Sequence, residues 1–232
     1  MGSERTVVVT GGTGGLGLAV TRAFIAVGYR TICTWVVERE RDRARDALGD
    51  EVELRQVDVS DPESVGGLAA DLDAGGGVWA LAHLVGGYHD GDPVESMDLE
   101  ALDRQLTLNL RATAVTLRAF LPGMTERGGG RVVTVSSRAA VAPFGGGGAY
   151  AASKAGVIAL VKAASDEVKG RGVTVNTVLP SVIDTPANRS AMPDADFSAW
   201  VAPDELASVI LFLCSPEASA VTGAAIPVYG RV

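Results

Sequence analysis

The sequence predicts a doubly wound α/β fold, with one parallel sheet of about seven strands and helices on both of its faces. Runs of β-branched and apolar residues recur along the chain, and segments with a helical period separate most of them. The runs show no polar alternation, which is typical of strands buried on both faces. The helical connections predict that the strands are parallel, because parallel neighbours need a long crossover.

The individual elements follow from this pattern in chain order. The expected strands are "RTVVVT" at 5–10, "YRTICTW" at 29–35, "VELRQV" at 52–57, "VWALAHLV" at 78–85, "GRVVTVS" at 130–136, "GVTVNTVL" at 172–179 and "AAIPVY" at 224–229. Glycine clusters between elements are expected to form turns. The stretch 180–203 has neither strand nor clear helical pattern, and we expect a substrate lid around 181–203. No linker composition or internal repeat marks a boundary, so residues 1–232 are expected to form one domain.

The composition excludes several classes of protein. Apolar residues make up 47% and charged residues 21% of the chain, which is typical of a globular protein. A net charge of -8 with no basic stripe disfavours nucleic acid as a partner. We see no export signal and no apolar run long enough to cross a bilayer, so we expect a cytoplasmic protein without membrane contact. Cys33 and Cys214 are expected in the core, and no metal site is expected.

A glycine-rich turn stands where the first strand leads into the first helix, in "VVVTGGTGGLGLAV". Gly11 suits the tight turn, Gly15 allows the backbone to approach a pyrophosphate, and Gly17 permits close packing of helix on strand. The amino terminus of the helix adds oriented N–H donors for an anion. This turn therefore predicts a dinucleotide site, and its expected contacts are Gly11, Thr13, Gly14, Gly15, Leu16 and Gly17.

A tyrosine and a lysine lie four positions apart in "AYAASK", and residues at this spacing share one face of a helix. Together with Thr-Gly-x-x-x-Gly-x-Gly upstream, this Tyr-x-x-x-Lys pattern resembles the classical short-chain dehydrogenase/reductase family. The resemblance covers essentially the whole chain and implies a Rossmann-type sheet. It extends to Asp58 in "DVSD", Asn109 in "LNL" and Ser137 in "TVSSR", which precedes Tyr150 by 13 residues.

The resemblance implies a catalytic role for four residues. Tyr150 would be the acid–base, and an ammonium at Lys154 would lower the pKa of its phenol, which is about 10 when unperturbed. Lys154 would also hold the nicotinamide ribose. Ser137 would hydrogen-bond the substrate oxygen, and Asn109 would hold a water that links Lys154 to solvent. If the resemblance is set aside, purely structural roles are the alternative: Ser137 would end a strand, Asn109 would cap a helix kink, and Asp58 would be an ordinary turn acid.

Cofactor contacts are implied at further positions, namely Trp35, Asp58, Val59, Gly86, Tyr150, Lys154, Pro180, Val182, Ile183 and Thr185. Thr185 would contact the nicotinamide carboxamide. Trp35 stands where members that prefer NAD usually have an acid, so NADP is somewhat favoured over NAD. Arg39 is a candidate clamp for the 2′-phosphate, or it belongs to the solvated face "ERERDRARD".

Other segments depart from the family. "HLVGGY" replaces the common Asn-Asn-Ala-Gly, and we interpret His83 as a packed histidine. "DTPANRSAMPDADFSAW", "VVERE" and "VGGY" resemble dihydropteridine reductase, a member of the same superfamily. In that enzyme an acid occupies the position of Trp35 and the catalytic serine is missing, and both differences count against a simple transfer of its function. Four apolar side chains would either cover a flat or greasy substrate or fasten the lid to the core: Met192, Pro193, Phe197 and Trp200.

The main functional hypothesis is an NAD(P)-dependent oxidoreductase that interconverts a carbonyl and an alcohol on a small molecule. A pteridine reductase of the dihydropteridine type is the alternative enzyme. A non-catalytic, dinucleotide-binding redox sensor is the alternative from another class, and the intact set of Ser137, Tyr150 and Lys154 disfavours it. Family members commonly form tetramers or dimers through long helices corresponding to 98–127 and 149–169, so a homo-oligomer is expected.

Overall fold

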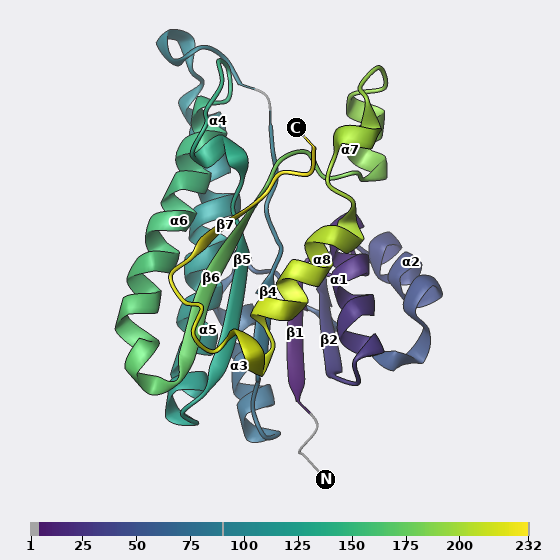
Figure 1. Ribbon diagram of the computed structural model, residues 1–232, viewed down its shortest axis with the longest axis vertical. Helices are drawn as coiled ribbons and strands as arrows, with labels where there is room; N and C mark the ends of the chain where they lie inside the picture. The colour runs from purple at the N-terminus through teal and green to yellow at the C-terminus, as the bar shows by residue number, and fades with distance from the viewer. Residues whose placement is uncertain (1–4, 90, 232) are drawn as a thin grey trace.

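In a computed structural model that describes residues 5–89 and 91–231, seven parallel strands form one sheet in the order β3-β2-β1-β4-β5-β6-β7 (Figure 1). The strands are β1 (Thr6–Thr10), β2 (Arg30–Trp35), β3 (Val52–Gln56), β4 (Ala80–His83), β5 (Gly130–Val135), β6 (Val173–Pro180) and β7 (Ala225–Val228). The predicted fold class and the predicted strands are confirmed. The chain order reverses between β1 and β4, and such a switch point opens a crevice at the carboxyl ends of the strands.

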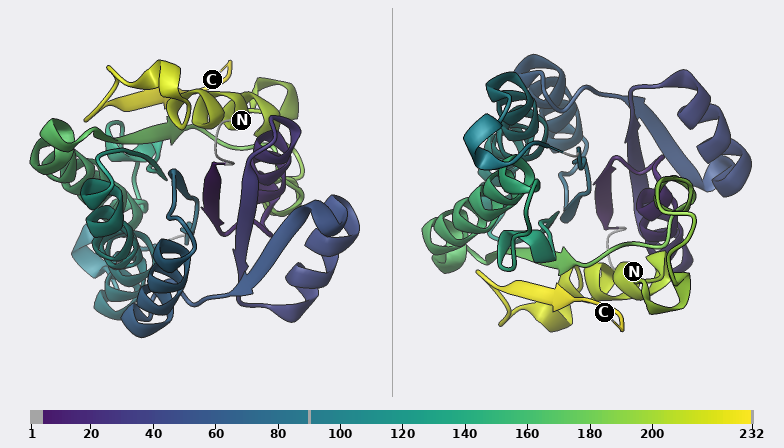
Figure 2. Two further views of the ribbon diagram at one scale, coloured as in Figure 1. Left: turned by 90° about the horizontal axis from the view of Figure 1, so that it is seen from below. Right: turned by 90° about the horizontal axis from the view of Figure 1, so that it is seen from above.

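Helices flank the sheet on both sides (Figure 2). They are α1 (Gly15–Ala26), α2 (Glu38–Leu48), α3 (Pro62–Ala74), α4 (Leu99–Gln105), α5 (Ala112–Glu126), α6 (Gly148–Val168), α7 (Pro186–Ala191) and α8 (Pro203–Leu213). Helices α1 and α8 pack together, as do α3 and α5, and α5 also contacts α6. Consecutive strand residues face opposite layers: Val8 belongs to one core cluster, while Val7 and Val9 belong to the other. The strands therefore need apolar residues throughout.

The long helix expected over 98–127 is interrupted. A π-helical turn (Leu106–Arg111) separates α4 from α5, and Asn109 lies in it. Such turns are rare and often mark functional sites, because they displace side chains from the regular helical positions. The helix expected over 149–169 is confirmed as α6.

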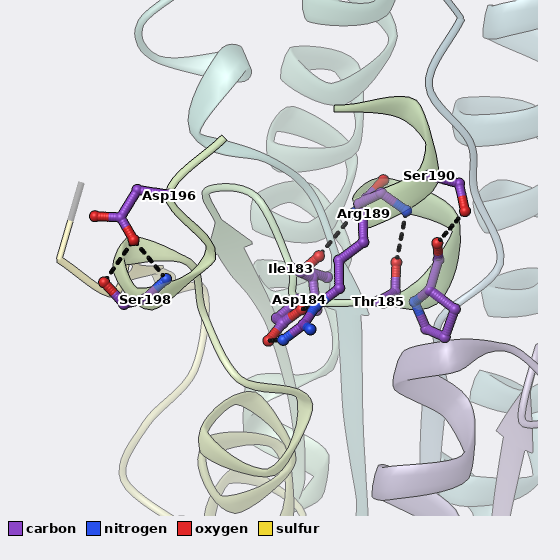
Figure 3. Close-up of polar contacts among 9 residues, drawn as sticks. Ile183, Asp184, Thr185, Arg189, Ser190, Asp196 and Ser198 are labelled. Atoms are coloured by element: carbon purple, nitrogen blue, oxygen red, sulfur yellow. Dashed lines mark hydrogen bonds and ion pairs between the residues drawn. The ribbon is translucent and has the colours of Figure 1, made fainter. Parts of the chain in front are cut away.

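The expected lid is more regular than its sequence indicates. It contains α7, a short helical turn (Phe197–Ala199) and a bridge between Ile183 and Val201. Figure 3 shows the contacts that order it: Arg189 binds the Asp184 carboxylate through Nε at 2.5 Å, and the Asp196 carboxylate accepts from Ser198. The sequence of this segment shows no helical or strand periodicity, because local hydrogen bonds of its side chains hold it in place.

Cys33 and Cys214 are free and buried, as expected of core residues. Among residues 5–89 and 91–231, no helix combines the length and apolarity needed to cross a membrane. The same ranges hold no cluster of three or more histidine, cysteine, aspartate or glutamate side chains arranged around a metal position. The expectation about an export signal rests partly on residues 1–4, which lie outside the described ranges.

Candidate active site

A cavity of about 1120 Å³ lies at the carboxyl ends of strands β1 to β6. Most of the expected site residues line it: Gly11, Thr13, Gly14, Gly15, Leu16, Gly17, Trp35, Asp58, Val59, Gly86, Ser137, Tyr150, Lys154, Pro180, Val182 and Ile183. Asn109 and Thr185 are not among the residues that line the cavity. The parallel sheet brings the segments together because each follows the same end of a strand.

The glycine-rich turn forms the floor of the cavity and gives α1 an open amino terminus. Gly14 is the N-cap of α1 and has no side chain to cap it, and the first turn carries no acid. Its N–H groups therefore suit an anion. A Cβ at Gly17 would lie 2.1 Å from the carbonyl oxygen of Gly11, and one at Gly15 would lie 2.8 Å from Thr185 Cγ2. The backbone geometry fits a dinucleotide pyrophosphate.

Thr185 is the N-cap of α7 and lies against the turn at Gly15. Its hydroxyl accepts a hydrogen bond from the Asn188 backbone N–H at 3.2 Å, and its methyl group faces Gly15. An oxygen that accepts a bond in this way can still donate its proton to a ligand. Its expected contact with a nicotinamide carboxamide stays a prediction.

The Tyr150 phenol, Ser137 and Lys154 meet at the other end of the cavity. Lys154 is 4% exposed and Ser137 is 8% exposed. The Lys154 ammonium donates to the Val135 carbonyl oxygen at 2.9 Å and lies 5.9 Å from the centre of the Tyr150 ring. The Ser137 hydroxyl accepts from the Ala139 backbone N–H at 3.1 Å, which fixes the serine at the start of a helical turn.

Burial shifts the pKa values of Tyr150 and Lys154 in opposite directions. Burial raises the pKa of Tyr150 above its ordinary value, and a hydrogen bond with Ser137 opposes the rise. Burial also lowers the pKa of Lys154 to about 8. Burial is the larger of the two effects on the phenol, and the expected lowering of the Tyr150 pKa by the Lys154 ammonium stays a prediction.

Asn109 is fully buried and tied to the loop after β4. Its side-chain oxygen accepts from the Gly87 N–H at 2.9 Å, and its amide donates to the Gly87 carbonyl oxygen, Gln105 and Ser153, each at 3.0 Å. A Cβ at Gly86 would lie 2.7 Å from both Asn109 Oδ1 and Lys154 Nζ. The asparagine therefore stands next to the lysine, with a bare glycine between them.

His83 is buried and shares a hydrogen bond between its Nδ1 and the Thr10 hydroxyl at 2.8 Å. Burial, together with the charge of Lys154, lowers the pKa of His83 to about 3. The imidazole is therefore neutral at physiological pH. This agrees with its interpretation as a packed histidine.

The apolar wall of the cavity comes mainly from residues outside the lid. Of the four apolar lid residues only Met192 lines the cavity, while Phe197 and Trp200 pack together with ring centres 4.8 Å apart. Tyr88 and Phe144 supply the aromatic wall, and the Tyr88 ring meets Tyr150 edge-on at 5.0 Å. Phe144 was not expected in the site, because its loop "APFGGGG" carries no motif.

The opposite end of the cavity, beyond β2 and β3, carries an acid that was not expected. Glu40 lines it and accepts a hydrogen bond from the Thr13 hydroxyl at 3.3 Å. Arg43 donates to the Thr13 carbonyl oxygen at 2.9 Å, and Arg41 lies over the Trp35 ring at 5.0 Å. Arg39 is exposed and does not line the cavity, in agreement with the solvated-face alternative.

Comparison with known proteins gives a consistent result. The sequence profile of the short chain dehydrogenase family matches residues 5–196. The chain is 34% identical to 3-oxoacyl-(acyl-carrier-protein) reductase FabG of Vibrio cholerae, over 97% of this chain and 96% of that protein. It is 35% identical to galactitol 2-dehydrogenase (L-tagatose-forming) of Cereibacter sphaeroides, over 96% and 92%. A short-chain type dehydrogenase/reductase from Mycobacterium ulcerans superposes with a TM-score of 0.91 at 28% identity, covering 98% and 89%.

A parallel sheet with an open helix amino terminus at one end of its crevice, and a half-buried tyrosine with a buried lysine at the other, defines an oxidoreductase that uses a nicotinamide dinucleotide. The chain belongs to the short chain dehydrogenase family, and its cofactor is NAD or NADP.

Proposed function

We propose that this protein interconverts a carbonyl and an alcohol, with Tyr150 exchanging the proton at the substrate oxygen. The observation that carries the proposal is the placement of a half-buried phenol, a buried hydroxyl and a buried ammonium along one cavity that begins at the glycine turn. A protein that only binds a dinucleotide gains nothing from desolvating a lysine and a tyrosine beside it, because burying ionisable groups is costly. This favours the enzyme over the redox sensor.

Each residue has a distinct part in the proposal. Tyr150 gives its proton to the oxygen during reduction and takes it back during oxidation. Ser137 holds the same oxygen as charge develops there, and loss of such a donor costs roughly 10²–10³ in rate. Lys154, while protonated, stabilises the phenolate that forms, and Asn109 positions the route by which the proton is replaced. The bound nicotinamide would supply or accept the hydride.

The same proposal extends to the cofactor and to assembly. The glycine turn, Trp35, Asp58 and Val59 would hold the adenosine and pyrophosphate, with NADP favoured by the missing acid at position 35 and opposed by the carboxylate of Glu40. A homo-oligomer is part of the proposal, and exposed apolar side chains on and beside α4, including Val94 and Leu99, support it. Light scattering of the purified protein tests this point.

A panel of ketones, quinones and quinonoid dihydropterin, assayed with NADPH and with NADH, tests the function. We expect ketones or quinones to be reduced. Binding of a cofactor without reduction of any compound would favour the redox sensor, and reduction of the dihydropterin alone would favour the pteridine reductase.

The variant Ser137→Ala separates the two enzymes further. Reduction of a ketone should fall by roughly 100-fold or more, since the developing charge loses its hydrogen bond. Reduction of a quinonoid dihydropterin does not need a carbonyl held by serine. If Ser137→Ala reduced the dihydropterin at the wild-type rate, the result would support the pteridine reductase.

A further inference from the structure

The charged residues that line the cavity are divided between its two ends. Glu40 and Asp58 follow β2 and β3, whereas Arg138 and Lys154 stand by β5 and in α6. Neighbouring strands lie about 4.8 Å apart, so the ends of β3 and β5 are separated by roughly 19 Å. The substrate end is therefore cationic in a protein whose net charge is -8.

Arg138 differs from the other half-buried arginines. Arg30, Arg41 and Arg55 each bind a carboxylate at 2.6–2.7 Å. The guanidinium of Arg138 makes neither a hydrogen bond nor an ion pair within residues 5–89 and 91–231, and it lies over the Tyr229 ring at 5.3 Å. A guanidinium has five N–H donors, and those of Arg138 are not among the buried polar atoms that lack a partner, so they are open to solvent. A ligand in the cavity can therefore bind them without displacing another partner within the protein.

The position of Arg138 relative to the reaction centre is fixed. It follows Ser137 directly, and its carbonyl oxygen accepts from the N–H groups of Val141 and Ala142 at 3.0 and 2.9 Å. Lys154 is already engaged with Val135, so Arg138 is the cation of this end whose donors are uncommitted. Tyr88 and Phe144 add an aromatic wall to the same cavity, with ring centres 6.2 Å apart and ring planes tilted by 56°.

We propose that the substrate carries a carboxylate on an apolar body, and that Arg138 binds this carboxylate while Ser137 and Tyr150 hold the reacting oxygen. Arginine suits the task because its planar fork matches a carboxylate with two parallel hydrogen bonds. This proposal rests on the proposed function, since it names the class of substrate for the same site.

Binding of two matched probes tests the proposal without turnover. 2-Naphthoate and 2-naphthamide have the same ring and nearly the same shape, and only the first is charged. Calorimetric titration of the protein should give at least about tenfold tighter binding of the naphthoate. Arg138→Gln should abolish this preference, and Arg138→Lys should retain part of it. Arg118→Gln, which changes an exposed arginine on α5, should leave it intact.

Equal affinity for the two probes, absence of binding by both, or a preference that survives Arg138→Gln would overturn the proposal. The melting temperature and the dissociation constant for NADH serve as folding controls, and we expect Arg138→Gln to preserve both. Because the readout is binding, a failure here is distinct from failure of the carbonyl panel. If carbonyls were reduced and the probes bound alike, the function would stand and the anionic substrate would not.

Discussion

Burial brings the pKa of Lys154 close to neutral pH. Its pKa of about 8 means that the ammonium is present below this pH and is lost above it, whereas an exposed lysine keeps its proton to about 10.4. Tyr150 has a raised pKa and stays protonated throughout this range. The Tyr150 phenol can therefore donate its proton across this pH range, and what changes with pH is the charge of Lys154, which stabilises the phenolate.

The pH dependence of reduction follows from these two groups. The value of kcat/KM for the reduced cofactor reports ionisations of the free enzyme. It should be level below about pH 8 and decline above it as Lys154 loses its proton. Lys154→Arg keeps its charge, so any residual activity of that variant should not decline until higher pH. A profile that is flat to pH 10 in the wild type would contradict the assigned role of the ammonium.

Trp35 and Glu40 make opposite contributions to the choice of cofactor. Trp35→Asp places a carboxylate at the expected adenosine ribose, where it accepts from a 2′-hydroxyl and repels a 2′-phosphate. The ratio of NADH to NADPH affinity should rise by about tenfold or more, since a charge-assisted hydrogen bond contributes roughly 1.5–3 kcal/mol. Fluorescence titration with both cofactors measures it. If the affinities for NADH and NADPH fell by the same factor, Trp35 would have a packing role only and would not distinguish the two cofactors.

Glu40→Gln is the complementary change at the same end. Removing its charge should move the ratio towards NADPH, because the carboxylate lines the cavity beside Thr13. Glu38→Gln is a matched control on the same helix, where the side chain is exposed and lies near Arg41. An unchanged ratio in Glu40→Gln would show that this acid does not contact the nucleotide.

Sequence and structure diverge at residues that tertiary packing brings to the site. The glycine turn, Ser137, Tyr150 and Lys154 were predicted from motifs and line the cavity. Glu40 could not be predicted, because it lies within a run of alternating charges on α2 and only the approach of that helix to Thr13 singles it out. The direction of the Tyr150 pKa depends on burial, which a motif does not contain.

At the level of elements, the turn into α1 depends on the absence of a side chain at Gly17. A Cβ there would lie 2.1 Å from the Gly11 carbonyl oxygen and 2.6 Å from the Gly12 backbone, and neither can move without reshaping the turn. Gly17 therefore permits close approach of the helix to the turn at Gly11 and Gly12, while the predicted packing of helix on strand stays a prediction.

Gly17→Ala should lower both stability and cofactor affinity. Overpacking typically costs about 1–3 kcal/mol, and each kcal/mol corresponds to roughly 2–4 °C in Tm for a chain of this size. Calorimetry and cofactor titration measure the two effects. Gly67→Ala in α3 is the control, because no atom lies within 4 Å of its added Cβ and Gly67 does not line the cavity. Equal, small effects in the two variants would contradict the packing argument.

The π-helical turn and the ordered structure of the lid were not predicted from the sequence. The resemblance implied one long helix over 98–127, and the π-helical turn within it was not predicted. The turn was nevertheless marked by Asn109, for which a helix kink had been considered. In the lid, the ion pair of Arg189 with Asp184 forms over a few residues and leaves no periodic signal.

On the scale of the whole molecule, the sheet was predictable because its strands are buried on both faces and must be apolar throughout. Parallel strands then place the segments that follow them along one edge, which gathers motifs from distant parts of the chain into one cavity. We propose that residues 1–232 form one domain, since the single sheet takes strands from Thr6 to Val228.

The central claim is that this assembled edge performs acid–base chemistry through Tyr150, and Tyr150→Phe tests it most directly. The ring stays and the transferable proton is removed, so NADPH and NADH should bind with dissociation constants within about twofold of wild type. Turnover of every active carbonyl, followed as loss of reduced cofactor, should fall by roughly 10²–10⁴-fold. A variant that binds the cofactors normally and still reduces its substrates at near wild-type rates would show that another group supplies the proton.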